Sequence, residues 1–172
     1  MSVDAELKRF GAYVVKQART NLTKTKKSDT KGLYNSIKFE SKVSPNSFEL
    51  SFIMSEHGKF VDKGVKGFSS SSKAPNSPYK FGTGTGKKGG LTNGIDGWVQ
   101  RKRIQFKDRK TGRFLSYKST AYLIRNSIWH KGLETTNFFT KPFEDAFKRL
   151  PDDLVEAFGL EVDRLFKNTT TQ

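Results

Sequence analysis

One glycine-rich segment has the letters of a nucleotide-binding loop. Residues 84–89 (GTGKKG) match G-x-G-x-x-G, a pattern in which glycines let the backbone approach a pyrophosphate. That chemistry needs a buried strand before the loop and a helix after it, and the sequence predicts neither beside this segment. A Walker A loop would need glycine in place of Phe81 and Ser or Thr in place of Lys88. We therefore predict no nucleotide site and no other cofactor.

The histidines and acids form no recognisable catalytic set. His57 follows Glu56, His130 lies far from both in the chain, and the sequence contains no cysteine. Hydrolytic metal sites generally take three protein ligands, and neither histidine is accompanied by a second His or a group of carboxylates. His130 falls in the last turn of a predicted helix, where its cation suits the helix dipole, and Asp62 fits an ion pair or a turn. We predict no catalytic residue, no metal and no enzyme activity.

A basic and aromatic stretch is the strongest candidate for contact with a phosphate backbone. In residues 98–107 (WVQRKRIQFK) bases are interleaved with aromatic rings, as on surfaces that contact phosphate and stack on bases. No helix-turn-helix, zinc finger or RNP motif accompanies it, so we expect contact without recognition of a base sequence. The alternative is that these aromatic residues belong to the core. The residues predicted to contact phosphate or a neighbouring subunit are Arg101, Lys102, Arg103, Lys107, Arg109, Lys110 and Arg113.

The chain is strongly basic, and its charge is unevenly distributed. Its 32 Lys and Arg against 17 Asp and Glu give a formal net charge of +15 and an isoelectric point of about 10.0. Residues 59–118 hold +12 of this charge, whereas residues 142–172 have a net charge of −3. Such polarity suits head-to-tail contact between copies of one protein, or contact with nucleic acid; a solvated face is the alternative. A second basic cluster comprises Lys16, Arg19, Lys24, Lys26, Lys27 and Lys31.

Length and composition predict one soluble domain. The chain has 172 residues, which is enough for a single buried core. Hydrophobic residues make up only 34% of it but include 15 Phe, so we expect a core built on phenylalanine. It has no Cys, no apolar run near the roughly 20 residues needed to cross a bilayer, and an acidic start unlike a signal peptide. We therefore expect an intracellular protein with no membrane partner.

The first half of the chain predicts a helix followed by a β-hairpin. Apolar residues at helical spacing predict an amphipathic helix over residues 4–19, then a polar, Lys-rich loop and a short turn at residues 32–37. The period then changes to two. Residues 39–43 and 48–52 alternate apolar with polar on either side of a turn, which predicts two paired strands.

Residues 65–97 predict a flexible basic arm. Gly, Ser and Pro occupy 15 of these 33 positions, and a segment of this composition does not repay the entropy of ordering by packing alone. A structureless insertion of this length in a compact domain is generally functional or disordered. The five arm lysines, predicted to contact a neighbouring subunit or partner, are Lys66, Lys73, Lys80, Lys87 and Lys88.

The next segment predicts a second hairpin between two helices. A short helix begins near Asp96, and residues 104–115 predict a hairpin about a turn at residues 108–112. A helix over residues 119–131 then ends at Gly132, where a C-terminal cap needs a positive φ.

The clearest apolar stripe lies near the C-terminus. It recurs every three or four residues over positions 143–165 and predicts a helix capped by Thr140, with a kink or break at Pro151 and a tail at residues 168–172. Together these elements predict an α+β fold in which antiparallel hairpins pack against N-terminal, middle and long C-terminal helices.

Four segments, together with the order of the elements around them, carry a resemblance to a known family. They are residues 30–37 (TKGLYNSI), 58–64 (GKFVDKG), 121–128 (AYLIRNSI) and 131–139 (KGLETTNFF). The chain resembles the neck or tail-completion proteins of tailed bacteriophages over residues 5–64 and 119–166. In that family an aromatic stretch ending in an acid and a glycine follows the hairpin, and a helix ending in K-G-(I/L), then T-x-F-F, precedes the last helix.

The resemblance implies a structural virion protein that forms a ring between portal and tail. It implies a homo-oligomer around the DNA channel, portal or adaptor and tail proteins as partners, non-specific contact with channel DNA, and assembly in the host cytoplasm. Residues 65–118 are longer and richer in glycine than the family usually has, which leaves open a long-tailed or a short-tailed, crAss-like phage. We expect the arm to be disordered in the monomer and ordered in the neck, so that its deletion abolishes ring joining while the monomer stays folded.

Two other functions are weighed against this one. A DNA- or RNA-binding accessory protein would bind duplex tightly, with a steep dependence on salt. A nuclease would need at least two acidic residues that converge on a metal, and the sequence indicates no such pair.

Overall fold

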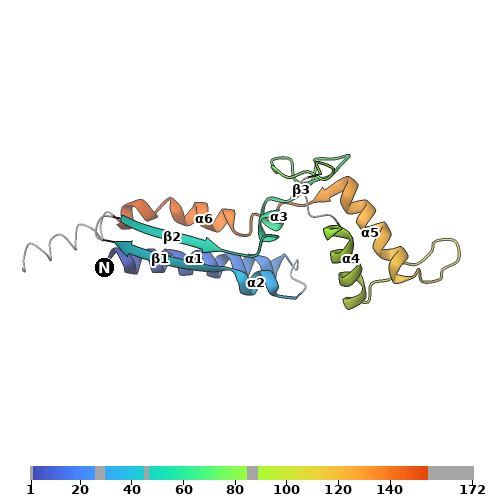
Figure 1. Cartoon of the computed structure of the whole chain (residues 1–172), viewed down its shortest axis with the longest axis horizontal. Coiled ribbons are helices and arrows are strands. Elements are labelled where there is room, and N and C mark those ends of the chain that lie inside the picture. Colours follow the sequence, from blue (N-terminus) through green and yellow to red (C-terminus); the bar gives the residue numbers. More distant parts are fainter. Residues whose placement is uncertain (1, 26–29, 45–46, 85–88, 155–172) are drawn as a thin grey trace, which may run out of the picture. The chain divides into compact units, whose positions relative to one another are not determined.

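The chain folds as two compact units, where one domain was expected. The computed structural model describes residues 2–25, 30–44, 47–84 and 89–154 (Figure 1). Unit 1 comprises residues 1–58 and 137–172, and unit 2 comprises residues 59–136. Both mix helices with a two-stranded antiparallel sheet or ribbon, so the predicted α+β class is confirmed.

Unit 1 combines helices with one β-hairpin. The strands are antiparallel, with Phe39 opposite Phe52 and Ser41 opposite Leu50, so the apolar positions of both strands share one face. This confirms the hairpin predicted from the period of two. The elements are α1 (Val3–Lys24), α2 (Gly32–Ser36), β1 (Lys38–Ser44), β2 (Ser47–Ile53) and α6 (Thr140–Phe147).

The core of unit 1 is built on phenylalanine, as predicted. Phe10 of α1 packs with Val14 and with residues of α6 and β2. Phe52 lies at the centre of an aromatic cluster, with its ring centroid 5.3 Å from that of Phe139 and 5.8 Å from that of Phe143, both edge-on. Such contacts between aromatic rings add to the free energy gained by burial.

Two predicted boundaries in unit 1 were wrong. Helix α1 continues past residue 19 to Lys24, because Leu22 extends the buried stripe and is 1% exposed. Thr140 does not cap α6: Phe139 occupies the N-cap position and makes no side-chain capping bond. The short turn predicted at residues 32–37 is the five-residue helix α2.

The predicted break of the last helix is confirmed. Helix α6 ends at Phe147, and residues 150–154 are again helical after a turn. Pro151 has no amide hydrogen to donate to the carbonyl group of Phe147, which explains why the ladder stops there. The rest of the predicted helix and the tail at residues 168–172 lie outside the described residues.

Unit 2 is organised around two packed helices and a short ribbon. Val99 of α4 and Ala121 of α5 are buried, and Arg125 of α5 lies 3.7 Å from a carboxylate oxygen of Asp96 in α4. The predicted helix near Asp96 is confirmed but begins earlier. The elements are α3 (Gly58–Lys63), by which the chain enters the unit, β3 (Val65–Lys66), α4 (Gly90–Arg101), α5 (Tyr117–Lys131) and β4 (Gly132–Leu133).

The expectation of a structureless arm over residues 65–97 was wrong for the part described. Strand β3 pairs with β4, and the amide groups of Phe68 and Ser69 donate to the last carbonyl groups of α5. Ala74 and Ser77 are buried, and the Ser77 hydroxyl donates to the carbonyl oxygen of Gly64 over 2.7 Å. These few contacts anchor a segment whose average composition predicts disorder.

The second predicted hairpin is shorter than expected. One antiparallel bridge joins Lys107 to Phe114, and no longer strand forms among the described residues of this segment. Helix α5 then begins at Tyr117, with the Ser116 hydroxyl as its cap, and ends at Gly132 with φ of 82°, which confirms the predicted positive φ.

Candidate interaction surfaces

The structure brings two of the arm lysines, Lys66 and Lys80, next to each other and places Lys73 in the folded loop. Lys66 lies in β3 opposite Gly132 and also bridges to Lys80. The carbonyl oxygen of Lys73 accepts a hydrogen bond from the amide of Thr135, so this residue is part of the folded loop. Lys87 and Lys88 lie outside the described residues.

Four of the seven predicted phosphate-contacting residues are brought together on one turn. Lys107, Arg109, Lys110 and Arg113 are exposed on the turn that connects the bridge residues, and we call these four side chains the basic tip. The side-chain nitrogen of Lys107 lies 5.0 Å from the ring centroid of Phe114, a cation–π contact. The other three, Arg101, Lys102 and Arg103, lie at the end of α4, and Arg103 has a φ of 53°.

The basic tip is anchored to the core of unit 2. Two backbone hydrogen bonds join the two sides of the turn. The amide of Asp108 donates to the carbonyl oxygen of Arg113 over 2.9 Å, and the amide of Leu115 donates to the carbonyl oxygen of Phe106. The amide of Phe106 in turn donates to the hydroxyl of Thr120, a fully buried residue of α5. The base of the turn is therefore held in place from two sides.

Asp108 shapes the turn from within. One of its carboxylate oxygens accepts hydrogen bonds from the amide of Thr111 at 2.7 Å, the amide of Lys110 at 2.9 Å and the hydroxyl of Thr111 at 3.0 Å. These bonds, that from the Thr111 amide above all, hold the pKa of Asp108 below its ordinary value. Asp108 thus organises the basic residues around it and stays ionised.

This arrangement predicts the pH dependence of the tip. Because the pKa of Asp108 is lower in the folded turn than in the unfolded chain, its carboxylate stabilises the turn at neutral pH, and this contribution is lost as the pH falls through the folded pKa. An NMR titration should give a lower pKa for Asp108 in the folded chain than in urea. Equal pKa values in the two states would contradict this prediction.

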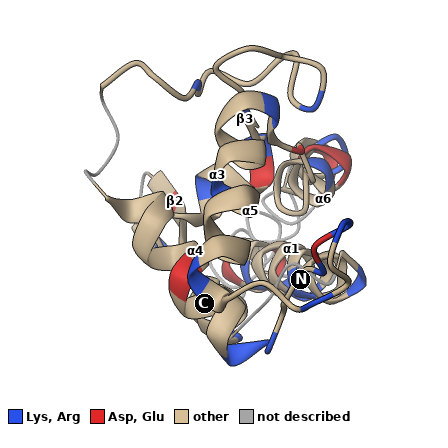
Figure 2. Cartoon of the chain, turned by 90° about the vertical axis from the view of Figure 1, so that its right-hand side faces the viewer, with Lys and Arg blue, Asp and Glu red and all other residues tan. Residues whose placement is uncertain are grey.

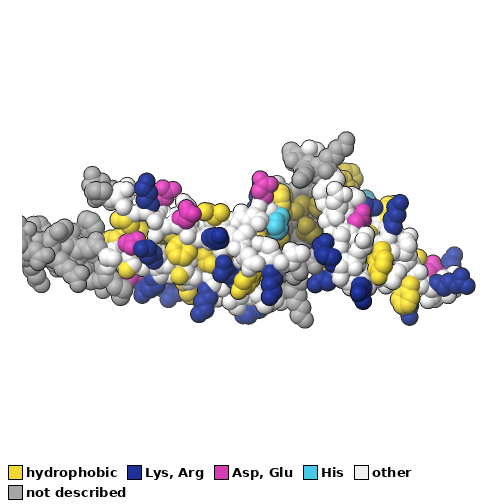
Figure 3. All heavy atoms as spheres, turned by 60° about the horizontal axis from the view of Figure 1, so that its bottom comes forward, with side chains coloured by type: hydrophobic (Ala, Val, Ile, Leu, Met, Phe, Trp, Pro, Cys, Tyr) yellow, Lys and Arg dark blue, Asp and Glu magenta, His cyan; other side chains and the backbone are white. Residues whose placement is uncertain are grey.

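Most of the formal net charge lies in unit 2. Unit 2 contains 17 Lys and Arg but only four Asp and Glu, a formal net charge of +13, which leaves +2 for unit 1. Figure 2 shows these charges along the ribbon. In Figure 3 Lys and Arg side chains surround exposed apolar side chains at the right-hand end, where α5 and the basic tip lie. The described part of unit 2 therefore has a basic surface on which aromatic side chains are exposed.

Two sequence segments that carry the family resemblance meet in unit 2. The Thr135 hydroxyl donates to the carbonyl oxygen of Lys63 over 2.8 Å, and the Thr136 hydroxyl donates to that of Val61 over 2.7 Å. The amide of Thr136 also donates to the carbonyl oxygen of Asp62, which is buried. We call this set of contacts, with the pairing of β3 and β4, the motif junction.

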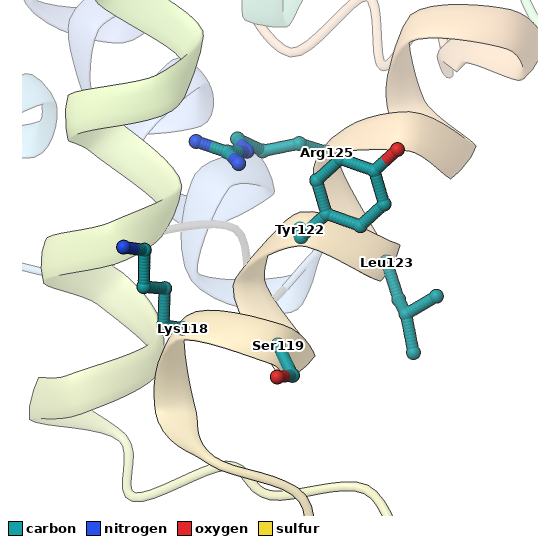
Figure 4. A pocket seen from close by; sticks show the side chains of 5 residues that line it. All are labelled: Lys118, Ser119, Tyr122, Leu123 and Arg125. Carbon is teal, nitrogen blue, oxygen red and sulfur yellow. The ribbon is translucent and has the colours of Figure 1, made fainter.

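A shallow hollow lies on the surface of α5. Its volume is about 380 Å³, and its lining residues are Lys118, Ser119, Tyr122, Leu123 and Arg125 (Figure 4). The Arg125 side chain extends toward α4, as its ion pair with Asp96 requires. No carboxylate or imidazole group lines the hollow, so its described walls offer no acid–base pair for catalysis.

Neither histidine belongs to a cluster of metal ligands in the part of the chain that is described. No three His, Asp or Glu side chains there gather as metal ligands. The imidazole of His130 lies 2.8 Å from the Ser69 hydroxyl, and His57 is exposed in a turn. Contrary to expectation a helix, α4, does follow the GTGKKG segment, but residues 85–88 lie outside the described residues and no strand immediately precedes them.

Sequence reasoning missed several exposed residues of unit 2. Lys118 extends the basic surface onto α5, and Phe114 exposes 63% of its surface beside the tip. Phe68 and Trp129 stack with ring centroids 6.3 Å apart and are both exposed. Spacing alone favoured a core role for such aromatic residues, and only the packing of α5 shows which of them face outward.

Comparison with models of known protein families, with curated proteins and with solved structures found no match. Among the described helices none is both long enough and apolar enough to span a bilayer.

Proposed function

We propose that this chain is a ring-forming subunit of a phage neck, a tail-completion protein that joins the portal region to the tail around the DNA channel. The observation that carries the proposal is the motif junction. The segments GKFVDKG and KGLETTNFF, which resemble the family in sequence, are about 70 residues apart and yet bind each other through three hydrogen bonds. The pairing of β3 with β4 continues this contact directly after the first segment. This contact between two of the resembling segments supports the proposal.

The third resembling segment also has a defined structural role. Residues 30–37 form α2 and its flanks, and the Arg19 guanidinium donates to the carbonyl oxygens of Tyr34 and Ile37 at 3.1 and 2.9 Å. It also lies over the ring of Tyr34, 5.1 Å from the centroid. Arg19 therefore fastens α2 to α1, which explains a basic residue near the end of the first helix without invoking a ligand.

The division of charge supports assembly of identical copies. A ring requires two different surfaces on one molecule that fit each other, and a unit of +13 joined to a unit of +2 with a net negative C-terminal segment offers such a pair. Contacts of this kind weaken as salt screens the charges.

The proposal predicts that the purified chain assembles into closed rings. Native mass spectrometry and negative-stain electron microscopy at low salt should show one ring order, and assembly should weaken at high salt because charged contacts are screened. Lys73→Gln combined with Lys80→Gln should weaken assembly more than Lys38→Gln combined with Lys42→Gln on the hairpin of unit 1, which removes the same charge. We choose these substitutions rather than deletion of the whole arm, because the deletion would also remove β3 and the buried residue Ala74.

A chain that stays monomeric under all these conditions, with and without portal proteins, would contradict the proposal. The second candidate is a DNA- or RNA-binding accessory protein, which the concentration of charge in unit 2 favours. A monomer that binds duplex DNA tightly, with a steep dependence on salt, would support that candidate instead.

A further inference from the structure

We propose that the basic tip of unit 2 binds the phosphate backbone of duplex DNA without reading its sequence. Residues 101–118 contain eight Lys and Arg and a single acid, Asp108. The four cations of the tip are exposed, and none of them forms a salt bridge with another described residue. The surface therefore presents unpaired positive charge to a partner outside the chain.

The shape of the tip is set before any ligand arrives. Asp108 binds amides of its own turn, the turn is closed by two backbone hydrogen bonds, and its base is fastened to buried Thr120. A pre-ordered turn loses less conformational entropy on binding than a free chain with the same charges would. The tip thus combines a high density of cations with a fixed backbone.

The chemistry of the tip favours a polyphosphate over a protein surface. The cores of protein–protein interfaces are depleted in Lys and Asp or Glu, whereas Lys and Arg are prominent among the groups that bind DNA phosphates. All four cations are exposed on a short turn, and the sequence contains no helix-turn-helix, zinc finger or RNP motif that would read base edges. We therefore expect electrostatic binding that releases counterions and is independent of sequence.

The choice of duplex DNA as the polyanion rests on the proposed function, because a neck encloses the path of the viral genome. The binding chemistry itself does not depend on ring formation. Two separate measurements, oligomeric state and DNA affinity, therefore distinguish failure of this inference from failure of the proposed function.

The test is a fluorescence anisotropy titration of the full chain against labelled duplexes of two unrelated sequences over a range of salt concentrations. The tip variant carries Arg109→Gln, Lys110→Gln and Arg113→Gln. Loss of three phosphate contacts should lower the affinity about tenfold or more near physiological salt, and should make the slope of log K against log salt shallower by about 2.7. The two duplexes should bind equally well.

A charge-matched control separates the tip from net charge. Lys16→Gln, Lys24→Gln and Lys38→Gln remove the same charge from exposed positions of unit 1, and we expect this variant to bind nearly as the natural chain does. An unchanged tryptophan fluorescence transition in urea would show that unit 2 of the tip variant is folded, since Trp98 and Trp129 both lie there.

Three results would overturn the inference. The first is absence of duplex binding by the natural chain at low salt, and the second is an equal loss of affinity in the tip variant and the control. The third is a tip variant that binds DNA normally but no longer assembles, which would assign the tip to a contact with a neighbouring subunit.

Discussion

Replacement of Gly132 by alanine is expected to destabilise unit 2 by about 2–6 kcal/mol. Gly132 follows α5 with φ of 82° and ψ of −179°, a conformation that is essentially restricted to glycine. A Cβ atom there would collide with the carbonyl oxygen of Val65 and would lie 2.6 Å from the amide nitrogen of Gly67. Backbone strain and overpacking, each of about 1–3 kcal/mol, would act together. The obstacle is backbone on both sides, so no side chain can rotate away.

The substitution also tests the proposed function, because Gly132 lies in the motif junction. Gly132 begins β4 and pairs with Lys66, so the substitution breaks the motif junction at its centre. Urea unfolding followed by tryptophan fluorescence reports on unit 2 alone, because the chain has two Trp and both lie in that unit. If the junction is needed for assembly, Gly132→Ala should also abolish ring formation.

Gly112→Ala is the matched control. Gly112 also has a positive φ, 69°, but no atom lies within 4 Å of the position that its Cβ would take. Only the strain of the left-handed conformation remains, and it should lower the free energy of unfolding by about 1 kcal/mol. Part of this loss is offset because alanine restricts the unfolded chain more than glycine does. Equal destabilisation by the two substitutions would show that packing against β3 contributes nothing.

Much of the fold could be predicted because the relevant signals are local. The hairpin of unit 1 follows from alternation at period two, and the end of α5 follows from one glycine at the position of a cap. The break near Pro151 follows from a missing amide hydrogen. Each of these features depends on residues close together in the chain.

The arm was predicted wrongly because its order depends on a few distant contacts. Composition averages over residues 65–97, whereas the loop is held by individual hydrogen bonds to segments far away in sequence. Examples are the bond from the Phe68 amide to the carbonyl oxygen of Trp129 and that from the Thr135 amide to the carbonyl oxygen of Lys73. The division into two units was not predicted. The chain leaves unit 1 at Gly58 and returns at Asn137; the basic stretch begins at residue 59, but a change in charge alone does not indicate a separate unit.

The cations of the candidate surface were predicted, but not their arrangement. Charge and aromatic spacing identified the residues of the tip, and the sequence also marked residues 108–112 as a turn. The role of Asp108 needed coordinates, because its carboxylate could equally have paired with a neighbouring base. Hydrogen bonds to amides of its own turn leave the surrounding cations unpaired, and this is why the tip is a candidate for binding phosphate.

Replacement of Phe52 by alanine is expected to destabilise unit 1 by about 3 kcal/mol. Its ring contacts those of Phe10, Phe139 and Phe143, with centroids 5.3 to 6.2 Å apart and all three pairs edge-on. The substitution removes apolar contact area and leaves a cavity between α1, β2 and the start of α6. Urea unfolding followed by far-ultraviolet circular dichroism should show the loss as a lower midpoint.

Phe48 provides a stringent control because it lies on the same face of the same strand. Phe48 pairs with Val43 as Phe52 pairs with Phe39, but 53% of its surface is exposed. Phe48→Ala should change the free energy of unfolding by no more than about 0.5 kcal/mol, as is usual for exposed positions. An equal loss from the two substitutions would mean that the end of the hairpin is buried by something beyond the described residues, for example a second copy of the chain. Because burial by a second copy depends on concentration, repetition of the measurement at several protein concentrations would then separate assembly from folding.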